Sequence, residues 1–127
     1  MPSVVVVDGN ADLRFLISLL LRLDGRATVV GDAPDGDAAV AVVESTRPDI
    51  VVMDATKSSL TGLDATRRIK QRWPATKVVL MTRPTDSPVQ DKARQIGADA
   101  LIDKLEVATA LLPELGGSAS HQTLAAS

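Results

Sequence analysis

The chain has 127 residues and a formal net charge of −2, and it contains no cysteine, one tryptophan and one phenylalanine. This length suits one domain with an aliphatic core, and the lack of cysteine excludes disulfide bonds and thiolate metal sites and fits a reducing compartment. The slightly acidic balance and the scarcity of aromatic side chains disfavour nucleic acid as a direct ligand.

The chain opens with an apolar run, Val4–Val7, which predicts a strand leading into Asp8. This strand begins too close to Met1 to leave room for the charged and apolar regions of a signal peptide. The cytoplasm is therefore the expected location.

A helix is expected next, capped by Asn10 or Asp12 and closed by Asp24-Gly25. Its leucines recur at helical spacing, which predicts an apolar face toward the core and a polar face opposite to it. The apolar face comprises Leu13, Leu16, Leu20 and Leu23, and the polar face comprises Arg14, Ser18 and Arg22. The helix is too short and too often interrupted by polar residues to span a membrane.

The alternation of strands and helices then continues toward the middle of the chain. Thr28–Val30 predicts a second strand, and a helix of Ala and Val opens at Asp35 and stops before Pro48. Ile50–Met53 is an unbroken apolar run, which predicts a strand buried on both faces. This strand delivers Asp54 to its carboxyl end.

The second half predicts two more strands and three helices. A helix capped by Thr61 and stopped by Pro74 should turn Leu63, Ile69 and Trp73 inward and its basic residues into solvent. A strand follows at Val78–Met81, ending on Thr82, and then a helix that Ser87-Pro88 starts and Gly97 ends. The last two elements are a strand at Leu101–Ile102, before Asp103 and Lys104, and a helix over about Glu106–Leu115 that Pro113 shortens.

Five strands alternating with five helices predict an α/β fold, with a doubly wound five-stranded parallel sheet in the order 2-1-3-4-5 and helices on both faces. Residues 1–115 are expected to form the domain, and residues 116–127, which are small and polar, a flexible tail or the start of a linker. Because parallel strands share one carboxyl edge, Asp8, Asp54, Thr82 and Lys104 should meet there. Two acids, a hydroxyl and an ammonium can bind a phosphoryl group with a metal between the acids.

The sequence resembles the receiver domains of two-component response regulators, the CheY-like family with a flavodoxin-like fold, over roughly Val4 to Leu115. It looks most like receivers joined to a LuxR-type helix-turn-helix effector. The motifs that carry the resemblance fall in order along the chain. They are Val6–Asp8, Val29–Ala33 with Asp35-Gly36, Arg47–Asp54, Gly62–Ala65, Val78–Thr82, Gly97–Asp99 and Lys104.

The resemblance implies a role for each residue at the expected edge. Asp54 would be the phosphoacceptor that attacks a phosphohistidine, and Thr82 and Lys104 would bind the phosphoryl oxygens. Asp8, Asp54 and the backbone carbonyl of Thr56 would hold Mg²⁺.

Several positions depart from the family's pattern. Gly9 replaces the second acid, which usually binds Mg²⁺ directly, so magnesium binding should be weak or absent. Arg83 replaces a small residue and Lys57-Ser58 replaces Met-Pro, and either Arg83 or Lys57 could place a cation near Asp54. Leu101 replaces the switch aromatic, which argues against an ordinary phosphorylation switch.

The expected function is therefore that of a receiver module in a phosphorelay, which signals through protein contacts with weak phosphorylation or with none. We expect no enzyme activity beyond self-phosphorylation at Asp54. Its expected partners are a sensor histidine kinase or another signalling protein, and a second copy of the chain, without nucleic acid or membrane contact. The interaction face would include Val89, Ile96 and Leu101. The alternative is a haloacid-dehalogenase-like phosphohydrolase with Asp8 as nucleophile, although Asn10 replaces the aspartate that this family needs as general acid.

Overall fold

The computed structural model describes residues 1–56 and 60–116, and its centre is a sheet of five parallel strands in the order β2-β1-β3-β4-β5. The strands are β1 Ser3–Val7, β2 Thr28–Ala33, β3 Ile50–Asp54, β4 Lys77–Thr82 and β5 Ala100–Asp103. The predicted order is confirmed, and β2 extends three residues beyond its predicted end at Val30.

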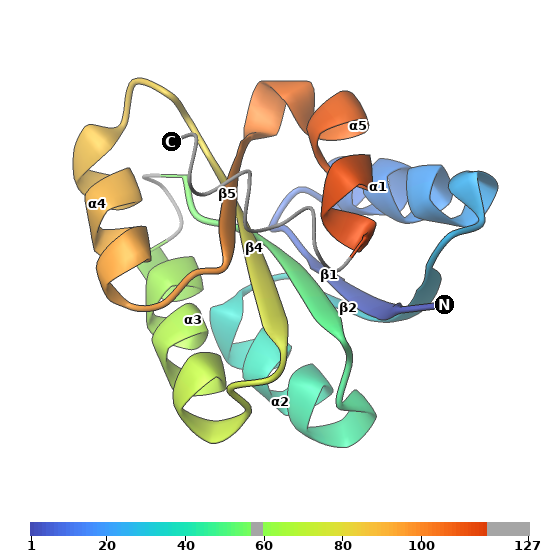
Figure 1. Cartoon of the computed structure of the whole chain (residues 1–127), viewed down its shortest axis with the longest axis horizontal. Helices are drawn as coiled ribbons and strands as arrows, with labels where there is room; N and C mark the ends of the chain where they lie inside the picture. The colour runs from blue at the N-terminus through green and yellow to red at the C-terminus, as the bar shows by residue number, and fades with distance from the viewer. Residues whose placement is uncertain (57–59, 117–127) are drawn as a thin grey trace.

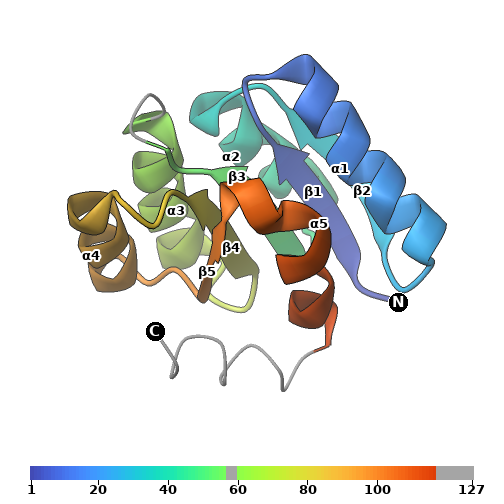
Figure 2. The ribbon, with the colours of Figure 1, turned by 90° about the horizontal axis from the view of Figure 1, so that it is seen from above.

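Helices cover both faces of the sheet, with α1 and α5 on one side and α2, α3 and α4 on the other (Figure 1). The helices are α1 Ala11–Asp24, α2 Gly36–Thr46, α3 Leu60–Arg72, α4 Ser87–Gln95 and α5 Val107–Ala110, with 3-10 turns η1 Lys104–Glu106 and η2 Leu112–Leu115. Seen from above, α1 and α4 lie at opposite ends of the molecule (Figure 2).

Alternation along the strands builds a separate core on each face of the sheet. In β1, Val4 and Val6 pack toward α1 and α5, whereas Val5 and Val7 pack toward α2, α3 and α4. All five residues of β3 are buried, because this strand is central and both of its faces are covered. The unbroken apolar run ending on Asp54 is therefore the middle of the sheet, as the sequence predicts.

Helix α1 turns a different face to the core from the one that its leucines predict. Ile17, Ser18 and Leu21 are buried, whereas Leu16 and Leu23 are 58% and 78% exposed. The buried Ser18 hydroxyl donates to the carbonyl of Arg14, so its burial leaves no unsatisfied donor. The prediction was wrong because apolar residues surround almost the whole helix, and its leucine spacing therefore marks no single face.

The helix caps agree with the prediction at α1 and α2 and differ at α3 and α4. Asn10 caps α1 through the amides of Asp12 and Leu13, and Gly25 closes it with a φ of 81°. Asp35 caps α2 through the amide of Ala38. The predicted caps of the next two helices lie inside them, since α3 already begins at Leu60 and α4 at Ser87. The Thr61 hydroxyl instead accepts a hydrogen bond from the amide of Gly36 and ties α3 to α2.

The C-terminal segment is short and irregular, as Pro113 predicts, and a buried ion pair fixes its end. The ammonium of Lys77 lies 3.1 Å from a carboxylate oxygen of Glu114 and donates to its backbone carbonyl at 2.6 Å. Glu114 is 1% exposed, so Lys77 supplies the charge that its burial requires. The predicted tail at residues 117–127 lies outside the described residues. No helix within 1–56 and 60–116 has the length and apolarity needed to cross a membrane.

Candidate functional site

The carboxyl edge of the sheet gathers the residues that the sequence singles out. Asp8 follows β1 directly, Asp54 and Thr82 are the last residues of β3 and β4, and Lys104 follows β5. All of them come from neighbouring parallel strands or the residue just after them, which explains why positions almost a hundred residues apart in the chain meet. Gly62 lies beneath this edge, where any Cβ would collide with the backbone carbonyl of Asp54.

Lys104 joins the two acids. Its ammonium nitrogen lies 3.0 Å from Oδ2 of Asp8 and 3.2 Å from Oδ2 of Asp54. The side chains of Asp8, Asp54 and Lys104 are 1%, 10% and 19% exposed, so water screens these contacts little. One ammonium thus neutralises one of two neighbouring carboxylate charges and leaves the trio with a net charge of about −1.

Within the described part of the chain, each carboxylate also accepts a hydrogen bond from a backbone amide. Oδ1 of Asp8 accepts a hydrogen bond from the amide of Asn10 at 2.8 Å, and Oδ1 of Asp54 accepts one from the amide of Thr56 at 3.0 Å. Oδ2 of Asp8 is buried and, within the described part of the chain, accepts no hydrogen bond of good geometry. Its stabilisation therefore comes from the charge of Lys104, and a second cation would find an available lone pair there.

A cavity of about 830 Å³ opens beside Lys104. Thr56, Arg83 and Lys104 contribute polar groups to its wall, and Leu13, Leu105 and Val107 contribute apolar ones. Arg83 is exposed and lines this cavity, and its role as a cation near Asp54 stays a prediction. Lys57, the other predicted cation, lies outside the described residues.

Two further residues reach the site that the sequence did not single out. Gln90 of α4 donates to the hydroxyl of Thr82 at 3.4 Å and to the carbonyl of Arg83 at 3.1 Å. Arg14, predicted to be solvated, is half-buried and donates to the backbone carbonyl of Asp8 at 2.7 Å. The sequence pattern does not indicate that Gln90 or Arg14 lies at the site. Each residue reaches the carboxyl edge of the sheet from a helix, and only packing against the sheet decides how that helix is rotated.

Gly9 has room for a side chain. A Cβ at this position would meet only the carbonyl oxygen of Pro34, at 3.5 Å, which is ordinary van der Waals contact. Among the described residues, the glycines with positive φ are Gly25 and Gly97, so the backbone at Gly9 does not demand glycine.

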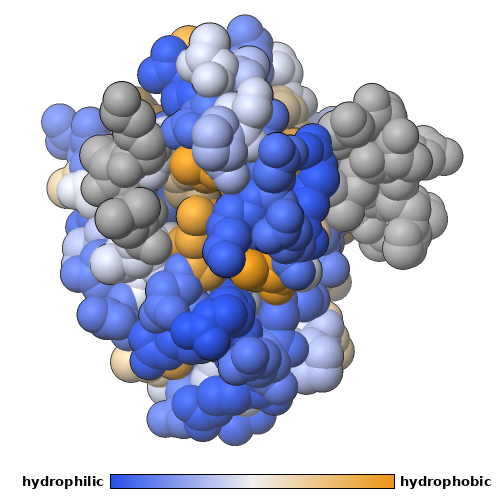
Figure 3. All heavy atoms as spheres, turned by 90° about the vertical axis from the view of Figure 1, so that its left-hand side faces the viewer, coloured by the Kyte–Doolittle hydropathy of each residue, from blue (hydrophilic) through white to orange (hydrophobic). Residues whose placement is uncertain are grey.

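The predicted interaction face contributes little exposed apolar surface. Val89 and Leu101 are partly buried against the core beneath α3 and α4, and Ile96 is half-buried. From the side of α4 and α3 the surface is mostly hydrophilic, with small hydrophobic areas between (Figure 3). Whether this face binds a partner remains a prediction.

The donor set fits Mg²⁺ only in part. Two carboxylates satisfy the minimum that Mg²⁺ needs when water fills its other positions, and the buried Oδ2 of Asp8 can accept a further cation. However, the described residues contain no group of three or more acidic, histidine or cysteine side chains that could hold a metal ion together. The ammonium of Lys104 also lies between the two acids. A magnesium ion would have to compete with this ammonium.

The chain matches the family model of the response regulator receiver domain over residues 4–115. It is 36% identical over 101 residues to a protein-glutamate methylesterase/protein-glutamine glutaminase of Geobacter metallireducens, covering 80% of this chain and 29% of that protein. It is 30% identical over 110 residues to the transcriptional regulatory protein DegU of Brevibacillus brevis, covering 87% of this chain and 47% of that protein. The chain thus spans less than half the length of either relative.

A solved structure shows the same architecture. The response regulator domain of Thermotoga maritima CheB is 26% identical and superposes with a TM-score of 0.81, over 95% of this chain and 97% of that one. The hydrolase alternative finds no support here, and Asn10, which would have to act as its general acid, instead caps α1 with its side chain. With its strand order, its edge residues and this match over nearly its whole length, the chain belongs to the response regulator receiver domain family.

Proposed function

We propose that this domain is the receiver of a longer response regulator and that it signals mainly through protein contacts, because its phosphoryl site is weakened. The observation that carries the proposal is the position of Lys104, whose ammonium lies 3.0 and 3.2 Å from the two acids while Gly9 supplies no third carboxylate. The ammonium stabilises the acids without a metal. It adds too little positive charge to offset an incoming phosphoryl dianion as well.

Asp54 is the proposed phosphoacceptor. A carboxylate oxygen of Asp54 would attack the phosphorus of a phosphohistidine, the P–N bond would break with its electron pair going to the histidine, and an acyl phosphate would form. Lys104 would pair with one phosphoryl oxygen, and the Thr82 hydroxyl would donate to another. The Thr82 hydroxyl accepts a hydrogen bond from Gln90, which leaves its own hydrogen available to donate to the phosphoryl group.

Magnesium is the proposed cofactor, bound weakly. Asp8, Asp54 and the backbone carbonyl of Thr56 would hold it, and it would neutralise the charge that accumulates when phosphoryl group and carboxylates meet. Because Lys104 already occupies the space between the acids, we expect a dissociation constant in the millimolar range or weaker. We propose no catalytic activity for the domain beyond its own phosphorylation.

The proposed partners are a sensor histidine kinase or another signalling protein, and not nucleic acid. Helix α3 has four basic residues, but each is paired with an acid: Arg67 with Asp64, Arg68 with Asp37, Lys70 with Asp99 and Arg72 with Glu44. A helix whose basic groups are already paired offers little free positive charge to a phosphate backbone.

The test is a titration of the purified domain with Mg²⁺ by calorimetry, followed by beryllofluoride with Mg²⁺ and amide NMR. We expect weak Mg²⁺ binding that Asp54→Asn removes, and amide shifts confined to the edge of the sheet. Tight, Asp54-dependent Mg²⁺ binding with shifts that spread to β5 and α4 would instead identify an ordinary phosphorylation switch.

A further inference from the structure

The side chain of Gln90 joins α4 to the end of β4. Its carboxamide nitrogen donates to the hydroxyl of Thr82 at 3.4 Å and to the backbone carbonyl of Arg83 at 3.1 Å. Thr82 is 1% exposed and Gln90 is half-buried, so little water reaches the contact between them. The two hydrogens of one NH2 group thus serve the last residue of β4 and the residue after it.

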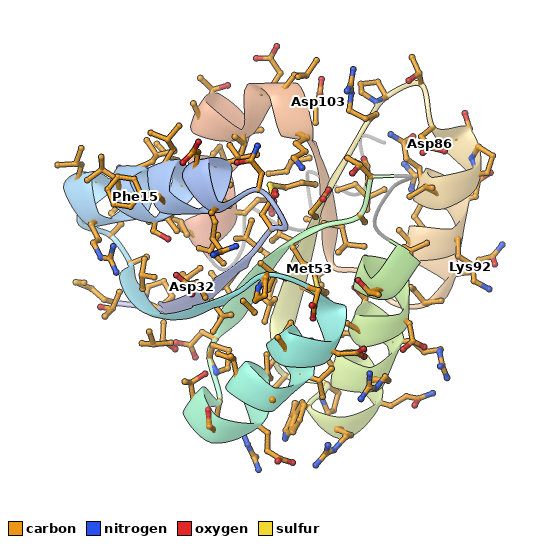
Figure 4. All side chains as sticks on the ribbon, turned by 180° about the vertical axis from the view of Figure 1, so that it is seen from behind. Phe15, Asp32, Met53, Asp86, Lys92 and Asp103 are labelled. Carbon is orange, nitrogen blue, oxygen red and sulfur yellow. The ribbon has the colours of Figure 1, made fainter. Side chains whose placement is uncertain are left out.

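The surrounding backbone holds the Gln90 carboxamide in place. The Arg83 carbonyl that accepts from it also accepts from the amide of Asp86 at 3.0 Å, where α4 is about to start (Figure 4). The backbone amide of Gln90 donates in turn to the carbonyl of Asp86 at 3.1 Å. The turn after β4 and the first turn of α4 therefore fix the carboxamide, and a side chain that is held in this way can orient its neighbour.

We propose that Gln90 is a positioning residue for Thr82, whose hydroxyl hydrogen it directs. A hydroxyl has one hydrogen and two lone pairs, so an amide hydrogen on a lone pair makes the Thr82 hydrogen point away from Gln90. This role rests on the proposed function, in which Thr82 donates that hydrogen to a phosphoryl oxygen. A donor that is oriented in advance stabilises the developing charge without a further cost of orientation.

Gln90 and a phosphoryl oxygen do not compete for Thr82. The amide uses a lone pair of the hydroxyl and the phosphoryl oxygen uses its hydrogen, so both contacts are compatible. Helix α4 can therefore keep its place when Thr82 donates, which agrees with the expectation that amide shifts stay at the edge of the sheet.

Amide NMR tests the contact without any phosphoryl group. The carboxamide of Gln90 has its own pair of signals, which Gln90→Met identifies by removing them. Thr82→Val, which removes the hydroxyl and keeps a similar shape, should shift these signals, and Thr82→Ser, which keeps a hydroxyl, should leave them close to the wild-type positions. Carboxamide signals that Thr82→Val leaves unchanged would overturn the role of Gln90.

The rate at which acetyl phosphate labels Asp54 tests the positioning role itself. Gln90→Met keeps the length of the side chain and removes its donor, and it should slow labelling about three- to tenfold, as expected for one hydrogen bond. In a Thr82→Val background the same change should slow labelling no further, because Gln90 acts through the Thr82 hydroxyl. The matched control is Gln95→Met, at an exposed position in the last turn of α4, which should leave the rate unchanged.

The labelling results distinguish a failure of this role from a failure of the proposed function. If the wild type takes no label at all, Asp54 is not the phosphoacceptor and the Thr82 hydrogen has no phosphoryl oxygen to serve. If the wild type is labelled and Gln90→Met has no effect, the positioning role alone is wrong. An equal loss with and without the Thr82 hydroxyl would also overturn it, because Gln90 would then act only through the Arg83 carbonyl. Circular dichroism confirms that each variant is folded.

Discussion

Gly9 is the position at which the resemblance to receivers leads us to expect a second acid, and a Cβ there meets only ordinary contact. We predict that Gly9→Asp strengthens Mg²⁺ binding and raises labelling of Asp54 by acetyl phosphate at least about tenfold, since a direct carboxylate ligand is worth more than an outer contact. The backbone adds no strain, because a Cβ there meets only the Pro34 carbonyl, at 3.5 Å. Phosphate labelling with and without Mg²⁺ measures the effect.

Asp54→Asn in the Gly9→Asp background is the control for this prediction, and it should abolish the labelling. If Gly9→Asp binds Mg²⁺ and Asp54 still takes no label, the missing acid is not the main defect. Arg83, exposed at the mouth of the cavity, would then be the next residue to change.

Lys104 lies within 3.2 Å of both acids, so its removal should expose their mutual repulsion. We predict that Lys104→Gln lowers the free energy of unfolding by about 2–3 kcal/mol, somewhat below the usual cost of breaking a fully buried pair because Lys104 is 19% exposed. Mg²⁺ should recover much of this loss, whereas it should stabilise the wild type little. Urea unfolding with and without Mg²⁺ checks both effects, and Lys92→Gln, at an exposed position on α4 (Figure 4), is the control.

At the scale of single elements, two leucines of α1 lie in different environments. Leu21 is fully buried, whereas Leu23 is 78% exposed. We predict that Leu21→Ala lowers the free energy of unfolding by about 3 kcal/mol, through lost burial and a cavity, and that Leu23→Ala changes it by less than about 0.5 kcal/mol. Urea unfolding at low protein concentration, where self-association does not contribute, measures both. Equal losses would show that the helix is rotated from the position described.

The ion pair between Lys77 and Glu114 fixes η2 to the start of β4. We predict that Glu114→Ala costs about 3 kcal/mol, because it leaves the Lys77 ammonium, 15% exposed, without its carboxylate. Glu44→Gln, which removes the exposed partner of Arg72, should cost less than about 1 kcal/mol and serves as the control. Chemical denaturation compares the two variants, and similar losses would mean that the pair is well hydrated.

At the scale of the whole molecule, the last residues that complete the core are Leu111, Glu114 and Leu115. We predict that a chain ending after Gly116 keeps the unfolding midpoint of the full chain, whereas a chain ending after Ala110 loses most of its stability. The reason is that Leu111 and Leu115 cover the sheet face that they share with α1. Thermal unfolding of the two truncated chains tests the proposed domain boundary at residue 115.

The sequence by itself determined the alternation of elements, the order of the strands and the edge where the site lies. The apolar runs Val4–Val7, Ile50–Met53 and Val78–Met81 predict buried strands, each followed by a polar residue, and the strand order follows from the rule for doubly wound α/β folds. Parallel strands then bring these ends to one edge, so Asp8, Asp54, Thr82 and Lys104 were placed correctly before any contact was known.

Only the tertiary structure decided how the helices are rotated and which polar groups meet. The sequence could not show that Ile17 and Leu21, and not Leu16 and Leu23, face the core, because apolar residues surround α1 and only contact with the sheet distinguishes its sides. Likewise, only the folded sheet brings Lys104 to both acids. Strand β4 lies between β5 and β3, and β1 is one strand further, so the lysine side chain must reach across strands that are about 5 Å apart.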